Sequence, residues 1–159
     1  MKITVLSVGK IKETYFTLGI QEYTKRLSRY CKFEMIEVPD EKTPDRASET
    51  EERQIKEKEG ERLKRYIKED AYVVALAIEG ESLDSIELSR KIEKLGIDGV
   101  SHIIFIIGGS LGLDESILNR ADCKLSFSRM TFPHQMMRMI LLEQVYRGYR
   151  IMKGEPYHK

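Results

Sequence analysis

The chain has 159 residues, of which 41% are hydrophobic and 33% are charged; this composition is typical of one globular domain, here residues 1–159, with a heavily charged surface. No apolar run reaches the roughly 18 residues that a membrane span needs. The two cysteines, Cys31 and Cys123, are too few for a disulfide framework. We therefore expect a cytoplasmic protein with two buried, reduced thiols and no metal site.

The net charge of +1 hides an uneven distribution of charge along the chain. Residues 1–32 carry seven Lys/Arg against two acids, residues 129–159 carry six against two, and residues 33–128 carry 14 against 22. If both ends of the chain lie on one face, they form a basic surface of the kind that binds nucleic acid. Alternatively, both ends are solvated helices whose charges have no partner, and charge alone leaves both interpretations open.

Apolar runs and helical patterns alternate along the chain. Strands are predicted at 2–9, 33–39, 71–80, 102–109 and 123–128, and helices at 14–30, 47–69, 85–95 and 133–152. This alternation predicts an α/β fold with a mostly parallel sheet flanked by helices. The runs at 71–80 and 102–109 are apolar on successive residues, which is typical of strands buried on both faces.

Two of the predicted helices have unusual faces. The helix at 47–69 has a thin apolar stripe, and ten acids and nine bases over 41–70 predict a solvated face with no role in nucleic-acid binding. The last helix is apolar nearly all round from Met136 to Leu142, with Arg138 as the only interruption. One of its sides can cover the sheet, and a symmetric dimer would cover the other.

The strand at 102–107 ends in the glycine-rich sequence GGSLG at 108–112. A P-loop closes on Lys-Ser/Thr, whereas this turn closes on Leu113 and Asp114. A dinucleotide site needs G-x-G-x-x-G, a long helix and an acid about 20 residues further on, and residues 125–135 hold no carboxylate. The loop is therefore either a tight structural turn or a site for a ligand without a phosphate chain, which the glycines allow to approach the backbone.

A second loop follows the last predicted strand in the sequence LSFSRMTFPHQMMR at 125–138. It carries Ser128, Arg129, Thr131 and His134 into the N-terminus of the last helix. Because ligands of open α/β sheets bind at the carboxyl ends of strands, the ends after 107 and 127 are predicted to form opposite walls of one pocket. The strand end at 76–80 would be its third wall.

Four segments, LAIEGE, IIGGSLGL, FSRMTFPHQMMRMILLEQVYRGYRI and the terminal PYHK, together resemble the SPOUT (α/β-knot) RNA methyltransferases. The resemblance covers essentially the whole chain and is closest to the ribosomal large subunit methyltransferase H group. It implies a homodimer with a Rossmann-like fold and a C-terminal trefoil knot, which binds S-adenosylmethionine. The implied reaction is methylation of N3 of a pseudouridine in large-subunit ribosomal RNA within assembled ribosomes.

The resemblance also assigns residues to the cofactor. The implied contacts lie at the end of the third strand, at the glycine loop and along the turn before the last helix: Leu76, Gly108, Phe127, Ser128, Arg129, Met130, Thr131 and Phe132. An adenine ring needs an apolar slot and backbone hydrogen bonds, and a sulfonium has no polyphosphate to neutralise, so these segments suit the cofactor chemically.

His134 is the candidate for removing the proton from N3, because a helix N-terminus lowers the pKa of an imidazole and keeps it neutral. Alternatively, His134 only caps or packs the helix, and Glu143 and Asp122 are fallback bases. Substrate contacts are expected from Arg147 and from the tail residues Tyr157, His158 and Lys159. An ordered tail would reach the pocket of the partner subunit, whereas many chain termini are simply disordered.

Two other functions compete with methyl transfer. A small basic module could bind ribosomal RNA without a cofactor, although the intact GGSLG and FSRMTFP turns disfavour it. A dinucleotide-dependent oxidoreductase is disfavoured by the composition of the glycine loop.

Overall fold

A computed structural model describes residues 1–159 as five strands and five helices in alternating order. The strands are β1 (Lys2–Val8), β2 (Lys32–Val38), β3 (Tyr72–Ser82), β4 (His102–Ile107) and β5 (Cys123–Ser126). The helices are α1 (Thr14–Leu27), α2 (Glu49–Lys64), α3 (Ser85–Ile97), α4 (Glu115–Arg120) and α5 (His134–Met152). The predicted α/β fold is confirmed, and most element boundaries move by only a few residues.

All five strands are parallel and lie in the order β2-β1-β4-β3-β5. The central strands β1 and β4 are buried along almost their whole length because helices cover both faces of the sheet. The pairing of β3 with β5 shifts its register between Leu76 and Glu81. Residues 77–80 therefore leave the ladder, at the edge where the carboxyl ends of the strands meet.

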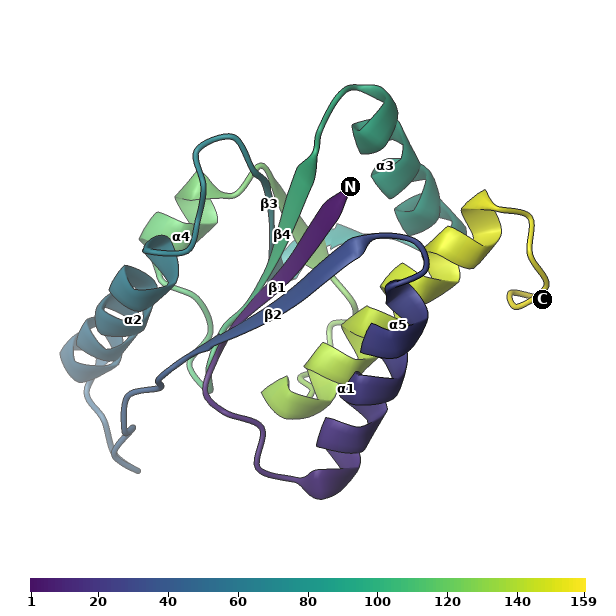
Figure 1. Cartoon of the computed structure of the whole chain (residues 1–159). Coiled ribbons are helices and arrows are strands. Elements are labelled where there is room, and N and C mark those ends of the chain that lie inside the picture. The colour runs from purple at the N-terminus through teal and green to yellow at the C-terminus, as the bar shows by residue number, and fades with distance from the viewer.

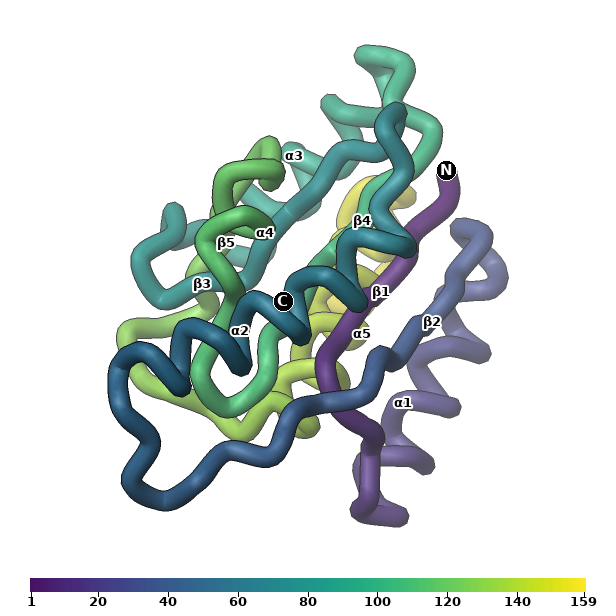
Figure 2. Tube along the Cα trace, turned by 90° about the vertical axis from the view of Figure 1, so that its left-hand side faces the viewer, coloured from purple at the N-terminus to yellow at the C-terminus, as the bar shows by residue number.

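Helices α1, α3 and α5 cover one face of the sheet, and α2 and α4 cover the other (Figure 1). Figure 2 shows α2 in front of the sheet and α5 behind it. Each face has its own hydrophobic cluster: Leu141, Leu142 and Val145 of α5 belong to one, and Leu63 of α2 and Ile117 of α4 to the other. None of the helices has the length and apolar content needed to cross a membrane.

Three expectations about packing need correction. Helix α2 ends at Lys64, five residues earlier than predicted, and its Glu59 is buried, only 4% exposed, so its charged face is not wholly solvated. Both thiols are free, but Cys31 and Cys123 are only half-buried. The predicted helix α5 begins at His134, with Pro133 as its N-cap residue.

The apolar sides of α5 are largely covered within the chain itself. Met139 packs so closely on Gly19 of α1 that a Cβ there would lie 2.3 Å from its sulfur, and Ser89 of α3 donates a hydrogen bond of 2.8 Å to the Gly148 carbonyl. Arg138, which interrupts the apolar pattern, is fully buried. The uncovered apolar side inferred from the sequence is therefore much narrower than expected. The trefoil knot stays a prediction.

The two basic ends of the chain do lie on one face, because α1 and α5 pack side by side (Figure 1). Part of their charge is neutralised there. Arg26 pairs with Glu22, Arg147 with Glu143 and Arg150 with Glu155. The basic residues left without an ion pair on these two segments include Lys10, Lys12 and Lys25.

Candidate active site

Three strand ends surround a cavity of about 480 Å³, within the usual range for small-molecule sites. One wall is the end of β3 with Leu76 to Glu79, the second is the glycine loop that follows β4, and the third is the turn between β5 and α5. The predicted three-walled pocket is confirmed. The register shift of β3 opens the site, since residues 77–80 no longer pair with β5.

The glycine loop is a tight turn whose backbone faces the cavity. The Gly112 N–H donates to the Gly109 carbonyl at 3.1 Å, and Gly112 adopts a φ of +87°, which favours glycine. A Cβ on Gly108 would lie 2.8 Å from the carbonyl carbon of Gly112, so a side chain there would displace backbone. The loop is therefore both a structural turn and a wall of the pocket.

Helix α2 supports this loop from behind and contributes to the pocket, which the sequence did not predict. Lys56 lines the cavity, and the buried carboxylate of Glu59 accepts a hydrogen bond of 3.2 Å from the Glu41 N–H. Burial raises the pKa of Glu59. A single buried acid inside a heavily charged helix leaves no signal in the residue pattern.

The turn before α5 holds itself in shape through serine hydroxyls. Ser126 Oγ donates to the Ser128 carbonyl at 3.1 Å, and the Met130 N–H donates to Ser128 Oγ at 2.9 Å. Of the eight predicted cofactor contacts, seven line the cavity: Leu76, Gly108, Phe127, Ser128, Met130, Thr131 and Phe132. Arg129 is exposed and does not line it.

His134 lines the same cavity from the first position of α5. Its pKa is lowered, first because it is partly buried and then by the positive charges of Arg138 and Lys12, while Asp40 acts in the opposite direction. The lowered pKa agrees with the expected neutral imidazole, but its main cause is burial of the ring and not the helix N-terminus. Neither ring nitrogen has a hydrogen-bond partner within the chain, so both are free to meet a substrate.

Arg138 fixes the start of α5 to the end of β1. Its Nη2 donates to the carbonyls of Val8 and Gly9, both at 2.8 Å, and its Nη1 pairs with Glu37 of β2 at 2.7 Å. Desolvation lowers the pKa of Arg138, although Glu37 acts against this. The guanidinium remains a charged anchor because its ordinary pKa is far above neutrality.

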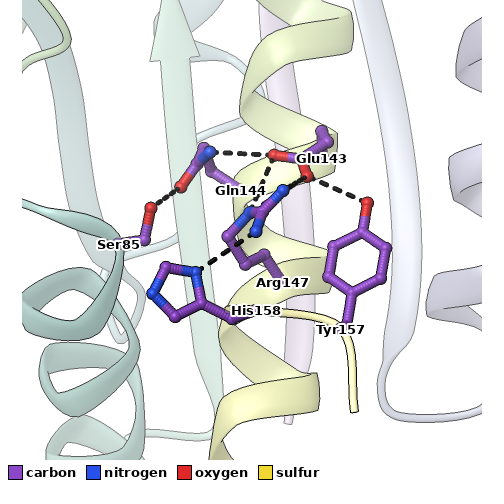
Figure 3. Close-up of polar contacts among 6 residues, drawn as sticks. All are labelled: Ser85, Glu143, Gln144, Arg147, Tyr157 and His158. Atoms are coloured by element: carbon purple, nitrogen blue, oxygen red, sulfur yellow. Dashed lines mark hydrogen bonds and ion pairs between the residues drawn. The ribbon is translucent and has the colours of Figure 1, made fainter.

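Three of the four predicted substrate residues, Arg147, Tyr157 and His158, gather beside the C-terminal half of α5 (Figure 3). Glu143 binds Arg147 at 2.6 Å and accepts the Tyr157 hydroxyl at 2.9 Å, and Arg147 Nη1 lies 3.2 Å from His158 Nδ1. The Arg147 guanidinium carbon lies 4.7 Å from the centroid of the Tyr157 ring. The tail is thus ordered against its own helix, while Lys159 is exposed and makes no ion pair.

Neither fallback base lines the cavity. Asp122 accepts the Val73 N–H at 2.7 Å and pairs with Arg120 at 3.3 Å, so its carboxylate has a structural role at the start of β5. Glu143 lies nine residues beyond His134, or about 13 Å along the helix axis. Of the three bases that the sequence offered, only His134 lines the cavity.

The cavity fits a nucleoside without phosphates. Most of its lining is apolar, with Leu76, Leu111, Phe127 and Met137 among the side chains, as an adenine ring requires. The titratable side chains that line it are Lys56, Glu79 and His134, and this set lacks the basic cluster that a phosphate chain needs.

Comparison with known proteins agrees with this geometry. Residues 1–158 match the family described as "Predicted SPOUT methyltransferase", and the chain belongs to that family. It is 64% identical to the ribosomal RNA large subunit methyltransferase H of Bifidobacterium adolescentis and 60% identical to proteins of the same name from Clostridium tetani and Alkaliphilus oremlandii. Each match spans 159 residues and covers all of this chain and all of the relative.

Proposed function

We propose that this protein transfers a methyl group from S-adenosylmethionine to large-subunit ribosomal RNA, at N3 of a pseudouridine in the assembled ribosome. The observation that carries the proposal is the cavity at the carboxyl ends of β3, β4 and β5, which suits a nucleoside and lacks a phosphate site. The names of the full-length relatives support the class of substrate. A cytoplasmic location follows from action on ribosomes.

The cofactor would lie with its adenine among the apolar residues of β3 and the turn before α5, against the backbone of Gly108. When bound, it would supply a methyl group activated by the positively charged sulfur: the carbon–sulfur bond would break as the carbon–N3 bond forms, with S-adenosylhomocysteine as the leaving group. The backbone of the glycine loop would exclude water from one side of the bound cofactor. The main catalytic contribution of the chain would be to orient the methyl donor and the acceptor base.

His134 would take the proton from N3. The pyrimidine imide proton is weakly acidic, and N3 must lose it to become a good nucleophile. The neutral imidazole, kept so by its lowered pKa, accepts that proton on a ring nitrogen that has no partner within the chain. Arg138 holds the helix start, and with it the imidazole, against the edge of the sheet.

We further propose that the active site is shared between two copies of the chain. Arg147 lies thirteen residues beyond His134, which places the tail cluster about 20 Å along α5 from that histidine. The simplest way for the tail cluster to contact the substrate is therefore at the pocket of a partner subunit. This cluster consists of Arg147, Tyr157, His158 and Lys159. Exposed Tyr15 and Leu18 on α1, 64% and 60% exposed, are apolar side chains that such a dimer would cover.

The deciding experiment uses the purified protein, methyl-labelled S-adenosylmethionine and ribosomes from cells that lack this gene, with free ribosomal RNA in parallel. We expect label in the large-subunit RNA of ribosomes, at N3 of one pseudouridine, and little label in free RNA. Equal labelling of free RNA would contradict recognition of the assembled ribosome. Cofactor binding without any label would show that the substrate is wrong.

A thermal-shift measurement separates the competing classes. A ligand that binds only the folded protein raises the melting temperature. Stabilisation by S-adenosylhomocysteine and none by NAD is expected. Stabilisation by neither ligand, with no label transferred, would leave an RNA-binding module without a cofactor.

A further inference from the structure

The loop that joins β1 to α1, residues 9–13, lies beside the cavity. Because β1 is the neighbour of β4 in the sheet, its end meets the glycine loop: a Cβ on Gly109 would lie 3.2 Å from Val8 Cγ1. The start of α5 borders the loop from the other side, because the Lys12 N–H donates to Oε1 of Gln135, the residue that follows His134, at 2.9 Å. The loop therefore borders two walls of the cavity, the glycine loop and the start of α5.

This loop is unusually well anchored for an exposed connection. Arg138, with no exposed surface, donates to the Val8 and Gly9 carbonyls. Glu37 Oε2 accepts the Ile11 N–H at 2.9 Å, and Gln135 Oε1 of α5 accepts the Lys12 N–H at 2.9 Å. Three side chains from two elements thus hold consecutive parts of one short loop.

The anchored loop presents two unpaired positive charges. Lys10 and Lys12 are both exposed, and neither forms an ion pair within the chain. Three arginines of the same face differ in this respect, because Arg26, Arg147 and Arg150 are paired with carboxylates of their own helices or tail, whereas Lys25 and Arg29, near the far end of α1, are also unpaired.

We propose that the β1–α1 loop is a phosphate-contacting element that positions the ribosomal RNA backbone at the mouth of the active site through Lys10 and Lys12. This inference rests on the proposed function, since it assigns the contact to the same substrate. Lysines bind phosphates as point charges without reading sequence, so the loop fixes the register of the RNA and leaves the choice of base to the cavity.

The test measures equilibrium binding to ribosomes that lack the modification, at several salt concentrations, for Lys10→Ala, Lys12→Ala and the double variant. Each lost phosphate contact should weaken binding several-fold and reduce the slope of log K against log salt by roughly 0.7–0.9. Affinity for S-adenosylhomocysteine should not change. The matched control is Lys25→Ala, which removes the same charge from an exposed, unpaired lysine near the other end of α1.

Gln135→Ala tests the anchoring separately, because it keeps both lysines and removes the acceptor of the Lys12 N–H. We expect Gln135→Ala to weaken ribosome binding, as Lys12→Ala does. A double lysine variant with the wild-type salt slope, or a Lys25→Ala loss of equal size, would overturn the inference. Binding is read without methyl transfer, so an inactive wild-type protein would instead count against the proposed function.

Discussion

The carboxylate of Glu59 faces Gly109 so closely that a Cβ on that glycine would lie 3.2 Å from Oε2 and 3.4 Å from Oε1. The neighbouring Gly60 packs in the same way on Asp114, the N-cap residue of α4. Helix α2 therefore packs against the glycine loop at Gly109 and against Asp114 just beyond it, and these two contacts hold the loop in place.

This contact predicts a pH-dependent difference in stability between the wild type and Glu59→Gln. Burial raises the pKa of Glu59 in the folded protein above its ordinary value of 4.5, so the folded state holds the proton more tightly than the unfolded chain. The wild type should therefore lose stability relative to the Gln variant as pH rises from about 4.5 through the raised pKa. Urea unfolding of both proteins between pH 4 and 7 measures this, and a constant difference would contradict it.

Replacing His134 by Asn should abolish most methyl transfer and leave the cofactor bound. Loss of a general base typically costs 10²- to 10⁴-fold in rate, while Asn keeps a polar group at the helix start. Because the pKa of His134 is lowered from 6.5, wild-type activity should rise with pH through a midpoint below 6.5. Single-turnover rates across pH test both points. The same midpoint in the variant would assign it to another group.

Gly108→Ala should cost the protein at least tenfold in affinity for S-adenosylhomocysteine. The new methyl group would lie 2.8 Å from the Gly112 carbon and 2.9 Å from its oxygen, so the loop would have to move. The matched control is Gly96→Ala, where α3 leaves room, with 3.5 Å to Met1 Cε, and where Ala favours the helix. Calorimetric titration should show the loss in Gly108→Ala only.

Arg138→Met should destabilise the protein by roughly 1–3 kcal/mol, the usual cost of leaving a buried polar group unsatisfied, because its ion-pair partner Glu37 is exposed and remains solvated. It leaves the Val8 and Gly9 carbonyls without their donor. Arg129→Met removes an exposed arginine with no ion pair, and its effect should stay within about 0.5 kcal/mol. Denaturant unfolding compares the two variants. Equal effects would mean that the buried network contributes little to stability.

A shared active site predicts that two inactive proteins restore activity when mixed. One is His134→Asn, and the other lacks residues 157–159. A dimer of the two holds one intact pocket facing one intact tail, so random exchange should recover about a quarter of the wild-type sites. No recovery, in dimers shown to have exchanged, would place pocket and tail in the same subunit.

The sequence was sufficient to predict the α/β fold, because β4 and the first half of β3 are continuous apolar runs, β1 is mostly apolar, and the helices between them have clear patterns. It also brought the three strand ends together into one pocket. It could not predict the supporting contacts of Glu59 and Arg138, because a charged residue buried by distant elements looks the same in a sequence as one in solvent. The helical pattern relates each of them only to residues a few positions away. Their actual partners are distant in the sequence: Val8 and Glu37 contact Arg138, and Glu41 and Gly109 contact Glu59.

The bond from Arg138 to the Val8 carbonyl joins residues 130 positions apart. During synthesis, β1 emerges first, and its loop lacks the Arg138 and Gln135 anchors until the last helix has been made. The edge that holds His134 and the β1–α1 loop is therefore assembled only when the chain is almost complete. On the proposed function, the nascent chain would thus present no finished active site to a ribosome before α5 has been made.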